Sequence, residues 1–372
     1  MLKNSKPPIC MLEIRCFWHA QKCFAFLTYP NKMSKQIKKV IFGLGTLIVG
    51  IVLFILTIKY IGIQAIINQF KTIQPTHILF YLMISTTIVI VLIIKWKLIL
   101  KALGFKIPFF NLFMYRQMGF SVGYIIPSFY IGGETVRAFF LKKHKVPLTD
   151  AISSVIIDRA VELPMNFFLA CIMFFLVVHT LNLPKLLLII SAIIMAILIL
   201  IGLAFYYKMY QKEYFFTYIF EILKLDRIKK LLKFKKKIME TETNLIKFFN
   251  HRKKFFIISL LISCLLWFLM ILEFKTALMI VGYNASLAQI YLVVTMTGFA
   301  MLFPIPASIG VLELSQIGIS ILVGIPPAVA VALSLLVRTR DFMWIVSGII
   351  FYIYHGTSYI RTITKDFTNN TK

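Results

Sequence analysis

Residues 185–207 have the sequence KLLLIISAIIMAILILIGLAFYY. After the first lysine this stretch contains no charged residue. An α-helix needs roughly 20 apolar residues to cross about 30 Å of hydrocarbon, whereas a buried helix of a soluble protein has an apolar run of about 10–14 residues. The stretch therefore predicts a membrane-spanning helix.

The composition of the whole chain supports the same conclusion. The chain has 372 residues, of which 60% are hydrophobic, and its mean hydropathy is +0.87. Soluble domains are about 45–50% apolar, and a soluble fold could not bury the excess. We expect an all-α polytopic membrane protein with six full transmembrane helices, at 40–58, 78–98, 151–178, 185–207, 255–281 and 327–354.

Two further apolar segments, 109–126 and 287–303, have a different pattern. Each ends in a break rich in proline and glycine, and a short helical stretch follows it, at 134–144 or 312–323. Two short helices joined by a break are typical of a re-entrant hairpin, although an ordinary span followed by a surface helix gives the same pattern. The predicted breaks contain Pro127, Gly132, Gly133, Pro304, Pro306 and Gly310.

The distribution of charge predicts an orientation. The formal net charge is +27, and the loop 208–254 alone has 14 Lys and Arg against 5 Asp and Glu. Placing all basic loops in the cytoplasm obeys the positive-inside rule with six crossings and two hairpins that return to the side they entered from. Both termini are then cytoplasmic, and the protein is expected in the cell (cytoplasmic) membrane. Eight crossings remain an alternative, because the other loops are short and almost uncharged.

The basic surplus favours the anionic inner leaflet rather than nucleic acid as a partner. We divide the chain into an irregular N-terminal extension, 1–32, and a single integral membrane domain, 33–372. The extension is a candidate for an incorrectly assigned start. Within the basic cytoplasmic segment 208–254, residues 215–238 have an amphipathic helical pattern typical of a helix on the inner membrane surface, or of a generic basic loop.

The chain contains an internal repeat. Residues 119–162 align without a gap to 298–341, at the offset of 179 residues that separates Pro127 from Pro306. Residues that are rare in membrane segments coincide at this offset: Glu134 with Glu313, Arg159 with Arg338, and Glu162 with Asp341. In the six-span scheme the copies, centred on 109–178 and 287–354, form an inverted repeat. Inverted repeats with broken helices are typical of secondary transporters.

Each copy also carries charge inside a long span. The first has Asp158, Arg159 and Glu162, and the second has Arg338, Arg340 and Asp341. A spacing of three residues predicts the pairs Arg159–Glu162 and Arg338–Asp341 on one helix face. Such charges cost roughly 2.5–3.5 kcal/mol each at the bilayer centre, so they either tie the helices together or line a polar pathway.

Other charged residues lie near the hairpins. Glu134 and Glu313 each lie at the start of a second hairpin helix, where the helix dipole favours an acid. Arg137 aligns with Gln316 and so has no charged counterpart. We expect Arg116 and Arg137 to be better placed than the other arginines to meet a phosphate from the inner side, because the guanidinium fork suits phosphate oxygens.

Motifs for catalysis, metals or nucleotides are missing from the sequence. The five cysteines form no CxxC or Cys/His pattern, and the six histidines are scattered. There is no GxxxxGK[ST] motif, no DxD and no HxxxD. We therefore predict no catalytic residue, no metal site and no cofactor.

The signatures of both copies resemble a known family. The pattern Gly132-Gly133-Glu134-x-x-Arg137, followed by Pro147 and Asp158-Arg159, and the pattern Pro304-x-Pro306-x-x-x-Gly310-Val311-x-Glu313, followed by Arg338, are similar to the lysylphosphatidylglycerol synthase transmembrane-region family. The likeness covers about 35–356. The loops Ser128–Ile131 and Ala307–Ile309 depart from the more glycine-rich family pattern, and no soluble transferase domain is present.

The resemblance implies movement or handling of lipids with charged head groups. We expect a lipid flippase or translocator for a phospholipid or polyprenyl phosphate. Two alternatives remain: an accessory subunit of a glycosyltransferase or other lipid-modifying enzyme, or an integral-membrane transferase. The predicted head-group pathway consists of Arg116, Glu134, Arg137, Asp158, Arg159, Glu162, Glu313, Arg338, Arg340 and Asp341.

Overall fold

The structure, a computed structural model, describes residues 34–70, 74–125, 131–180, 185–222, 229–301, 303 and 305–369. All regular secondary structure in these residues is helical, which confirms the all-α prediction. The extension 1–32 and the break residues Pro127 and Pro304 lie outside them. The chain forms two units, 1–49 and 50–372, and the described part of the first is the beginning of helix α2.

A helix lies at the position of each of the six predicted spans. These helices are α2 (Ser34–Ile61), α4 (Pro75–Ala102), α7 (Leu148–Thr180), α8 (Lys185–Tyr210), α11 (Lys253–Ile280) and α14 (Pro327–Asn369). The shorter elements are α3 (Ile63–Gln69), α5 (Phe109–Ile125), α6 (Ile131–Phe140), η1 (Leu141–His144), α9 (Phe215–Ile222), α10 (Lys229–His251), α12 (Leu287–Ala300), η3 (Pro306–Ser308) and α13 (Val311–Val323).

Several of these helices are long and apolar enough to cross a membrane. Four described segments meet this condition: Pro75–Ala102, Leu188–Tyr210, Lys253–Ile280 and Pro306–Val323. A fifth is the pair Ile48–Ile61 and Ile63–Gln69, which is bent by 81°. The prediction of a polytopic membrane protein is confirmed, whereas six crossings and two re-entrant hairpins remain predictions.

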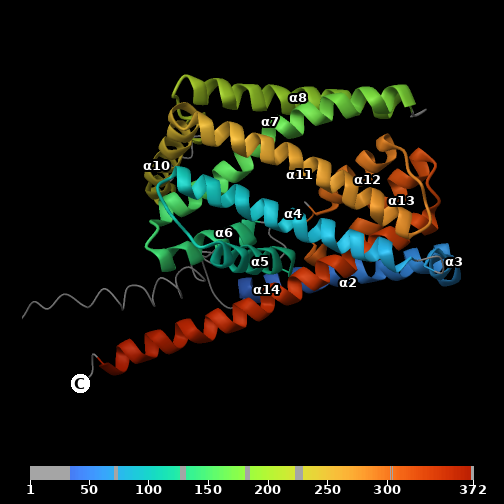
Figure 1. Cartoon of the computed structure of the whole chain (residues 1–372), viewed down its shortest axis with the longest axis horizontal. Helices are drawn as coiled ribbons and strands as arrows, with labels where there is room; N and C mark the ends of the chain where they lie inside the picture. Colours follow the sequence, from blue (N-terminus) through green and yellow to red (C-terminus); the bar gives the residue numbers. More distant parts are fainter. Residues whose placement is uncertain are drawn as a thin grey trace, which may run out of the picture. The chain divides into compact units, whose positions relative to one another are not determined.

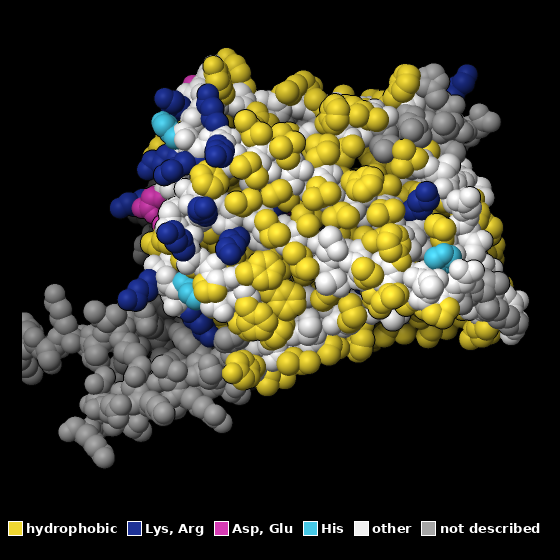
Figure 2. Space-filling view, viewed as in Figure 1, with side chains coloured by type: hydrophobic (Ala, Val, Ile, Leu, Met, Phe, Trp, Pro, Cys, Tyr) yellow, Lys and Arg dark blue, Asp and Glu magenta, His cyan; other side chains and the backbone are white. Residues whose placement is uncertain are grey.

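The surface of the second unit has the character that a bilayer requires. Leu186, Ile190, Ile193, Ile197 and Leu200 of α8 are all exposed, although water would oppose such a surface. Figure 2 shows hydrophobic side chains over the middle of the visible face, with Lys and Arg gathered at one end. A hydrophobic band next to a basic end is the pattern of a protein held in a membrane.

The internal repeat has the same element order in both copies. A long helix, two short helices and a second long helix follow one another in α4–α5–α6–α7 and again in α11–α12–α13–α14. The helices α4 and α11 pack along each other, α5 packs along α14, and α12 packs against α7. In Figure 1, α5 and α6 lie towards the end marked by α10, and α12 and α13 lie at the opposite end. The repeat thus extends beyond the aligned residues to include α4 and α11.

Each hairpin is packed into its own hydrophobic core. Trp96, Met118 and Leu141 belong to the core that joins α4, α5 and η1. Leu278, Val294 and Val331 belong to the core that joins α11, α12 and α14. Because apolar side chains hold each hairpin against its long helix, the polar side chains that these helices carry have fixed positions.

Helix α7 contains a proline, and a tyrosine compensates for it. Pro164 has no N–H to donate to the carbonyl of Ala160, which a membrane would leave without a partner. The hydroxyl of Tyr206 on α8 donates a hydrogen bond to this carbonyl. The break in the hydrogen bonding of α7 therefore ties α8 to the helix that carries the buried carboxylate of Asp158.

The basic segment contains two helices. For residues 215–238 the sequence left open an amphipathic surface helix or a generic basic loop, and the described residues of this range belong to α9 and α10. The buried carboxylate of Glu242 on α10 accepts hydrogen bonds from the backbone N–H groups of Phe216 and Thr217 in the first turn of α9. Leu245 and Phe248 of α10 are buried in a core with α7 and α8, so this half of α10 packs on the protein.

Candidate functional site

The charged residues of the first repeat meet around one buried carboxylate. Asp158 on α7 is 1% exposed, and three cations surround it. The Lys95 Nζ atom lies 3.0 Å from Oδ1, the Arg137 Nη2 atom 3.0 Å from Oδ2, and the Arg116 Nη1 atom 3.8 Å from Oδ2. These cations come from α4, α6 and α5, so the carboxylate joins both hairpin helices to both long helices of the copy.

A second group of ion pairs adjoins this one. Arg159 on α7 donates through Nε to Glu134 Oε1 at 2.5 Å and through Nη1 to Glu162 Oε2 at 3.2 Å. The second contact confirms the pair predicted from spacing. Glu162 also accepts a hydrogen bond from Lys95. We call the whole set the first-repeat cluster: Lys95, Arg116, Glu134, Arg137, Asp158, Arg159 and Glu162.

Lys95 is the member of this cluster that the sequence prediction missed. It is not among the predicted pathway residues, but its side chain is fully buried about two turns before the end of α4. A signal existed, because Asp158 and Glu162 are four residues apart on α7 and therefore share a face that requires a cation. The sequence could not show which helix supplies it.

Two guanidinium groups in the first-repeat cluster have unused donors. The Nη1 atom of Arg116 and the Nε atom of Arg137 are buried and have no hydrogen-bond partner. The guanidinium of Arg137 also lies 4.3 Å from the centre of the Trp96 ring. The cluster holds four cations and three carboxylates, which leaves one uncompensated positive charge. Unused donors and excess positive charge together favour an anionic ligand.

The second repeat has an equivalent of the Glu134–Arg159 pair. Arg338 donates through Nε to Glu313 Oε1 at 2.5 Å and through Nη2 to Oε2 at 3.0 Å. Glu313 also accepts from the Gly310 N–H at 2.9 Å. These glutamates and arginines align in the sequence repeat, so the two copies share one interaction as well as one element order.

In the second repeat this pair holds the break between α12 and α13 in place. Arg338 donates to the carbonyls of Ala307 and Ser308 at 2.9 and 3.2 Å. Both residues have left-handed backbone angles, with φ of 54° and 48°. Inside a membrane these carbonyls would be costly without a donor. Arg338 therefore has a structural role, which is one of the two roles considered from the sequence.

The predicted Arg338–Asp341 pair is wrong. The donors of Arg338 are engaged by Glu313 and the loop carbonyls, and Asp341 accepts from Arg340 Nη2 at 2.8 Å. Arg340 Nη1 lies 2.7 Å from Glu273 Oε2 on α11. We call Glu273, Arg340 and Asp341 the Arg340 triad. Glu273 was missed because a single acid within a long apolar run has no partner in its own helix.

Close backbone packing positions the first hairpin. A Cβ atom added at Gly133 on α6 would lie 2.2 Å from the Gly119 carbonyl oxygen on α5. This contact lets the helices approach closely enough for Arg116 and Arg137 to reach the same carboxylate. Gly132 and Gly133 were predicted in the break, but both lie in the first turn of α6. Of the other predicted break residues, Gly310 has φ of 81°, a left-handed conformation that suits glycine, and Pro306 begins η3.

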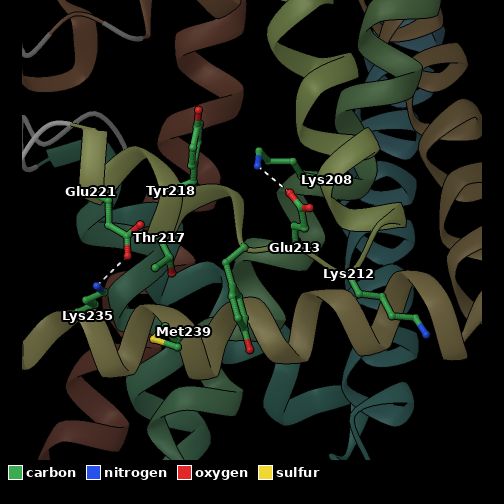
Figure 3. A pocket seen from close by; sticks show the side chains of 9 residues that line it. Lys208, Lys212, Glu213, Thr217, Tyr218, Glu221, Lys235 and Met239 are labelled. Atoms are coloured by element: carbon green, nitrogen blue, oxygen red, sulfur yellow. Dashed lines mark hydrogen bonds and ion pairs between the residues drawn. The ribbon is translucent and has the colours of Figure 1, made fainter.

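A separate pocket of about 460 Å³ lies where α8, α9 and α10 meet (Figure 3). Lys208 pairs with Glu213 at 2.9 Å, and Lys235 pairs with Glu221 at 2.8 Å across this pocket. Lys212 is the third lysine that lines this pocket.

The described residues contain no group of three or more His, Cys, Asp or Glu side chains that could hold a metal ion.

The predicted pathway residues divide among the first-repeat cluster, the Glu313–Arg338 pair and the Arg340 triad. Lys95 and Glu273 are additions that the sequence did not predict.

Comparison with known proteins gives consistent matches. The profile described as lysylphosphatidylglycerol synthase TM region matches residues 41–349. A UPF0104 membrane protein of Methanocaldococcus jannaschii is 33% identical over 118 residues, which cover 31% of this chain but only 35% of that relative. One from Pyrococcus horikoshii is 27% identical over 316 residues, covering 80% and 92%. Another, from Methanothermobacter thermautotrophicus, is 23% identical over 331 residues, covering 85% and 96%.

Proposed function

Because the chain belongs to the lysylphosphatidylglycerol synthase transmembrane-region family, we propose that it moves lipids with phosphate-bearing head groups across the cell membrane. The first-repeat cluster receives the phosphate. The observation that carries this proposal is the pair of buried guanidinium atoms without a hydrogen bond, Arg116 Nη1 and Arg137 Nε, beside an uncompensated positive charge.

The chemistry of the first-repeat cluster matches a phosphodiester. Such a group carries one negative charge, which would balance the excess, and its oxygens accept the kind of hydrogen bond that the two guanidinium groups can donate. Arg159 adds a cation whose side chain is 50% exposed even though it lies inside a long helix. An exposed cation next to buried, unused donors gives an anion a route into the cluster.

The repeat architecture supplies a means of movement. Each hairpin packs against the long helix of the other copy, α5 on α14 and α12 on α7. Rocking of one repeat against the other would open the first-repeat cluster to one side of the membrane and then to the other. The side chains of the breaks and long helices keep their ion pairs within one copy, so each copy can move as a body.

The orientation follows from the charge at the two ends. Lys101, Lys142 and Lys254 are exposed at the end of α4, in η1 and at the start of α11, and Lys237 is exposed within α10. Figure 2 shows Lys and Arg side chains gathered at one end of the visible face. We place this end and both chain termini in the cytoplasm, following the positive-inside rule.

The test is reconstitution of the whole protein into liposomes that carry fluorescent phosphatidylglycerol, phosphatidylcholine or a polyprenyl phosphate in separate samples. The protein is expected to speed translocation of at least one of them above protein-free vesicles. Arg116→Gln should lower that rate by about 10-fold, since a hydrogen bond to a charged group contributes about 1.5–3 kcal/mol.

Arg252→Gln is the matched control, because Arg252 is exposed at the start of α11. It should retain the wild-type rate. A wild-type rate equal to that of protein-free vesicles would refute the proposal, and so would equal rates for wild-type and Arg116→Gln. The lipid that is moved identifies the source of the phosphate.

A further inference from the structure

The Arg340 triad has the opposite charge balance to the first-repeat cluster. Two carboxylates, Glu273 at 3% and Asp341 at 4% exposed, share one guanidinium. The triad therefore carries one uncompensated negative charge on helices α11 and α14. Burying such a charge within a membrane is costly, so the triad favours uptake of a cation.

One buried polar atom of the triad, Oε1 of Glu273, has no hydrogen-bond partner. The hydroxyl of Tyr81 on α4, a side chain that is 2% exposed, lies beside the triad and interacts with the guanidinium of Arg340. Tyr81 interacts electrostatically with all three members of the triad, so it faces the same space. Arg338, which is paired with Glu313, also interacts electrostatically with Asp341. The unsatisfied carboxylate oxygen of Glu273, buried beside one guanidinium that two carboxylates share, points to a ligand.

We propose that the Arg340 triad binds one proton, and that this proton is carried together with the anionic head group held by the first-repeat cluster. The proton forms an O–H bond with a carboxylate oxygen of Glu273 or Asp341 on one side of the membrane and leaves from the same atom on the other. Nothing is oxidised or reduced, and one positive charge accompanies one negative charge.

A proton fits this site better than a metal cation does. A metal ion would require several oxygen ligands around it, and the guanidinium of Arg340 already occupies the space between the two carboxylates. A proton needs no such shell, and it converts an unsatisfied acceptor into a donor.

The charges of the two sites provide the coupling. The first-repeat cluster, the Glu313–Arg338 pair and the Arg340 triad together contain six cations and six carboxylates, so the charges of these three sites balance when no ligand is bound. An anion in the first-repeat cluster would leave the interior with one net negative charge and would strengthen proton binding at the triad. By reciprocity, the proton would strengthen anion binding to the same extent.

The proton site is tested first without transport. Infrared difference spectra of the purified full-length protein, recorded from mildly acidic to mildly alkaline pH, should show a titrating buried carboxyl group. Glu273→Gln or Asp341→Asn should remove this signal, and Glu240→Gln, at an exposed position on α10, should keep it. A wild-type spectrum without such a signal, or one that both triad variants retain, overturns the proposal.

The coupling is tested in vesicles, and this half rests on the proposed function. An imposed pH gradient should raise the rate of fluorescent phosphatidylglycerol movement several-fold in the wild type, and a proton ionophore should abolish the increase. Glu273→Gln should move the lipid at one rate with or without the gradient. A wild-type rate that ignores the gradient overturns the coupling but leaves the lipid translocator intact. If no lipid moves at all, the proposed function fails, and the infrared titration alone decides the proton site.

Discussion

Arg159 and Arg338 occupy equivalent positions in the two repeats, yet their surroundings give them different roles. Each donates through Nε to the equivalent glutamate at 2.5 Å. The side chain of Arg338 is 17% exposed and also donates to two backbone carbonyls, whereas the side chain of Arg159 is 50% exposed. The same ion pair therefore fixes a loop in one copy and leaves a cation accessible in the other.

This difference predicts unequal effects of removing the two glutamates. Glu313→Ala leaves a largely buried arginine without its carboxylate, which costs about 3–5 kcal/mol. Glu134→Ala leaves a half-exposed arginine that keeps Glu162, and exposed pairs are worth about 0–1 kcal/mol. The melting temperature of the purified protein should fall much further for Glu313→Ala. Equal falls for the two variants would contradict the structural role of Arg338.

At the scale of elements, the first hairpin depends on the contact between α5 and α6. Gly119 and Gly133 let the two backbones touch, and the side chain of Arg137 lies over Gly119. The second hairpin lacks this contact, because no atom lies within 4 Å of a Cβ built at Gly298. The two hairpins thus share an element order but not a packing mode.

We expect Gly133→Ala to destabilise the protein by about 1–3 kcal/mol, because the new methyl group would overlap the Gly119 carbonyl. The matched control is Gly318→Ala in α13, where a Cβ meets no atom within 4 Å and helix propensity favours alanine by about 0.5–1 kcal/mol. Thermal melting in detergent should show a clear loss for the first variant and no loss for the second. A Gly133→Ala protein as stable as wild type would contradict the close packing of α5 and α6.

At the scale of the whole molecule, the fold brings the lysine-rich ends of helices to the same side of the protein. The end of α4 and the start of α11 are rich in exposed lysine, with Lys101 and Lys254 as examples. Near the C-terminal ends of α2 and α11, exposed lysines are few, and Lys59 and Lys275 are two of them. If the lysine-rich end faces the cytoplasm, a reagent in the cytoplasm reaches positions 101 and 254, and a reagent outside the cell reaches positions 59 and 275.

This expectation is tested with single cysteines in a chain whose own five cysteines are replaced. In intact cells, a membrane-impermeant thiol reagent should label cysteine at position 59 or 275 and should label position 101 or 254 only after the cells are opened. Labelling of one member of each pair from outside would contradict the proposed orientation. Cysteine at 142 then tests the first hairpin, because re-entrance places it on the same side as 101.

Sequence and structure agree closely on the elements and less closely on the site. The helices, their order and the hairpin segments follow from apolar run length and from proline and glycine, because these are local properties of the chain. The aligned Glu134–Arg159 and Glu313–Arg338 positions also follow from the sequence, and the structure turns them into ion pairs. The sequence did not indicate that each of these pairs joins two helices.

The sequence by itself determined that this chain is an all-α membrane protein with an internal repeat and rare charges in register. Only the tertiary structure decided which charges meet. Lys95 reaches Asp158 across helices, and Glu273 reaches Arg340 in the same way. A buried charge needs a partner within a few ångströms, and that partner can lie anywhere along the chain, so only the packing of the helices determines it.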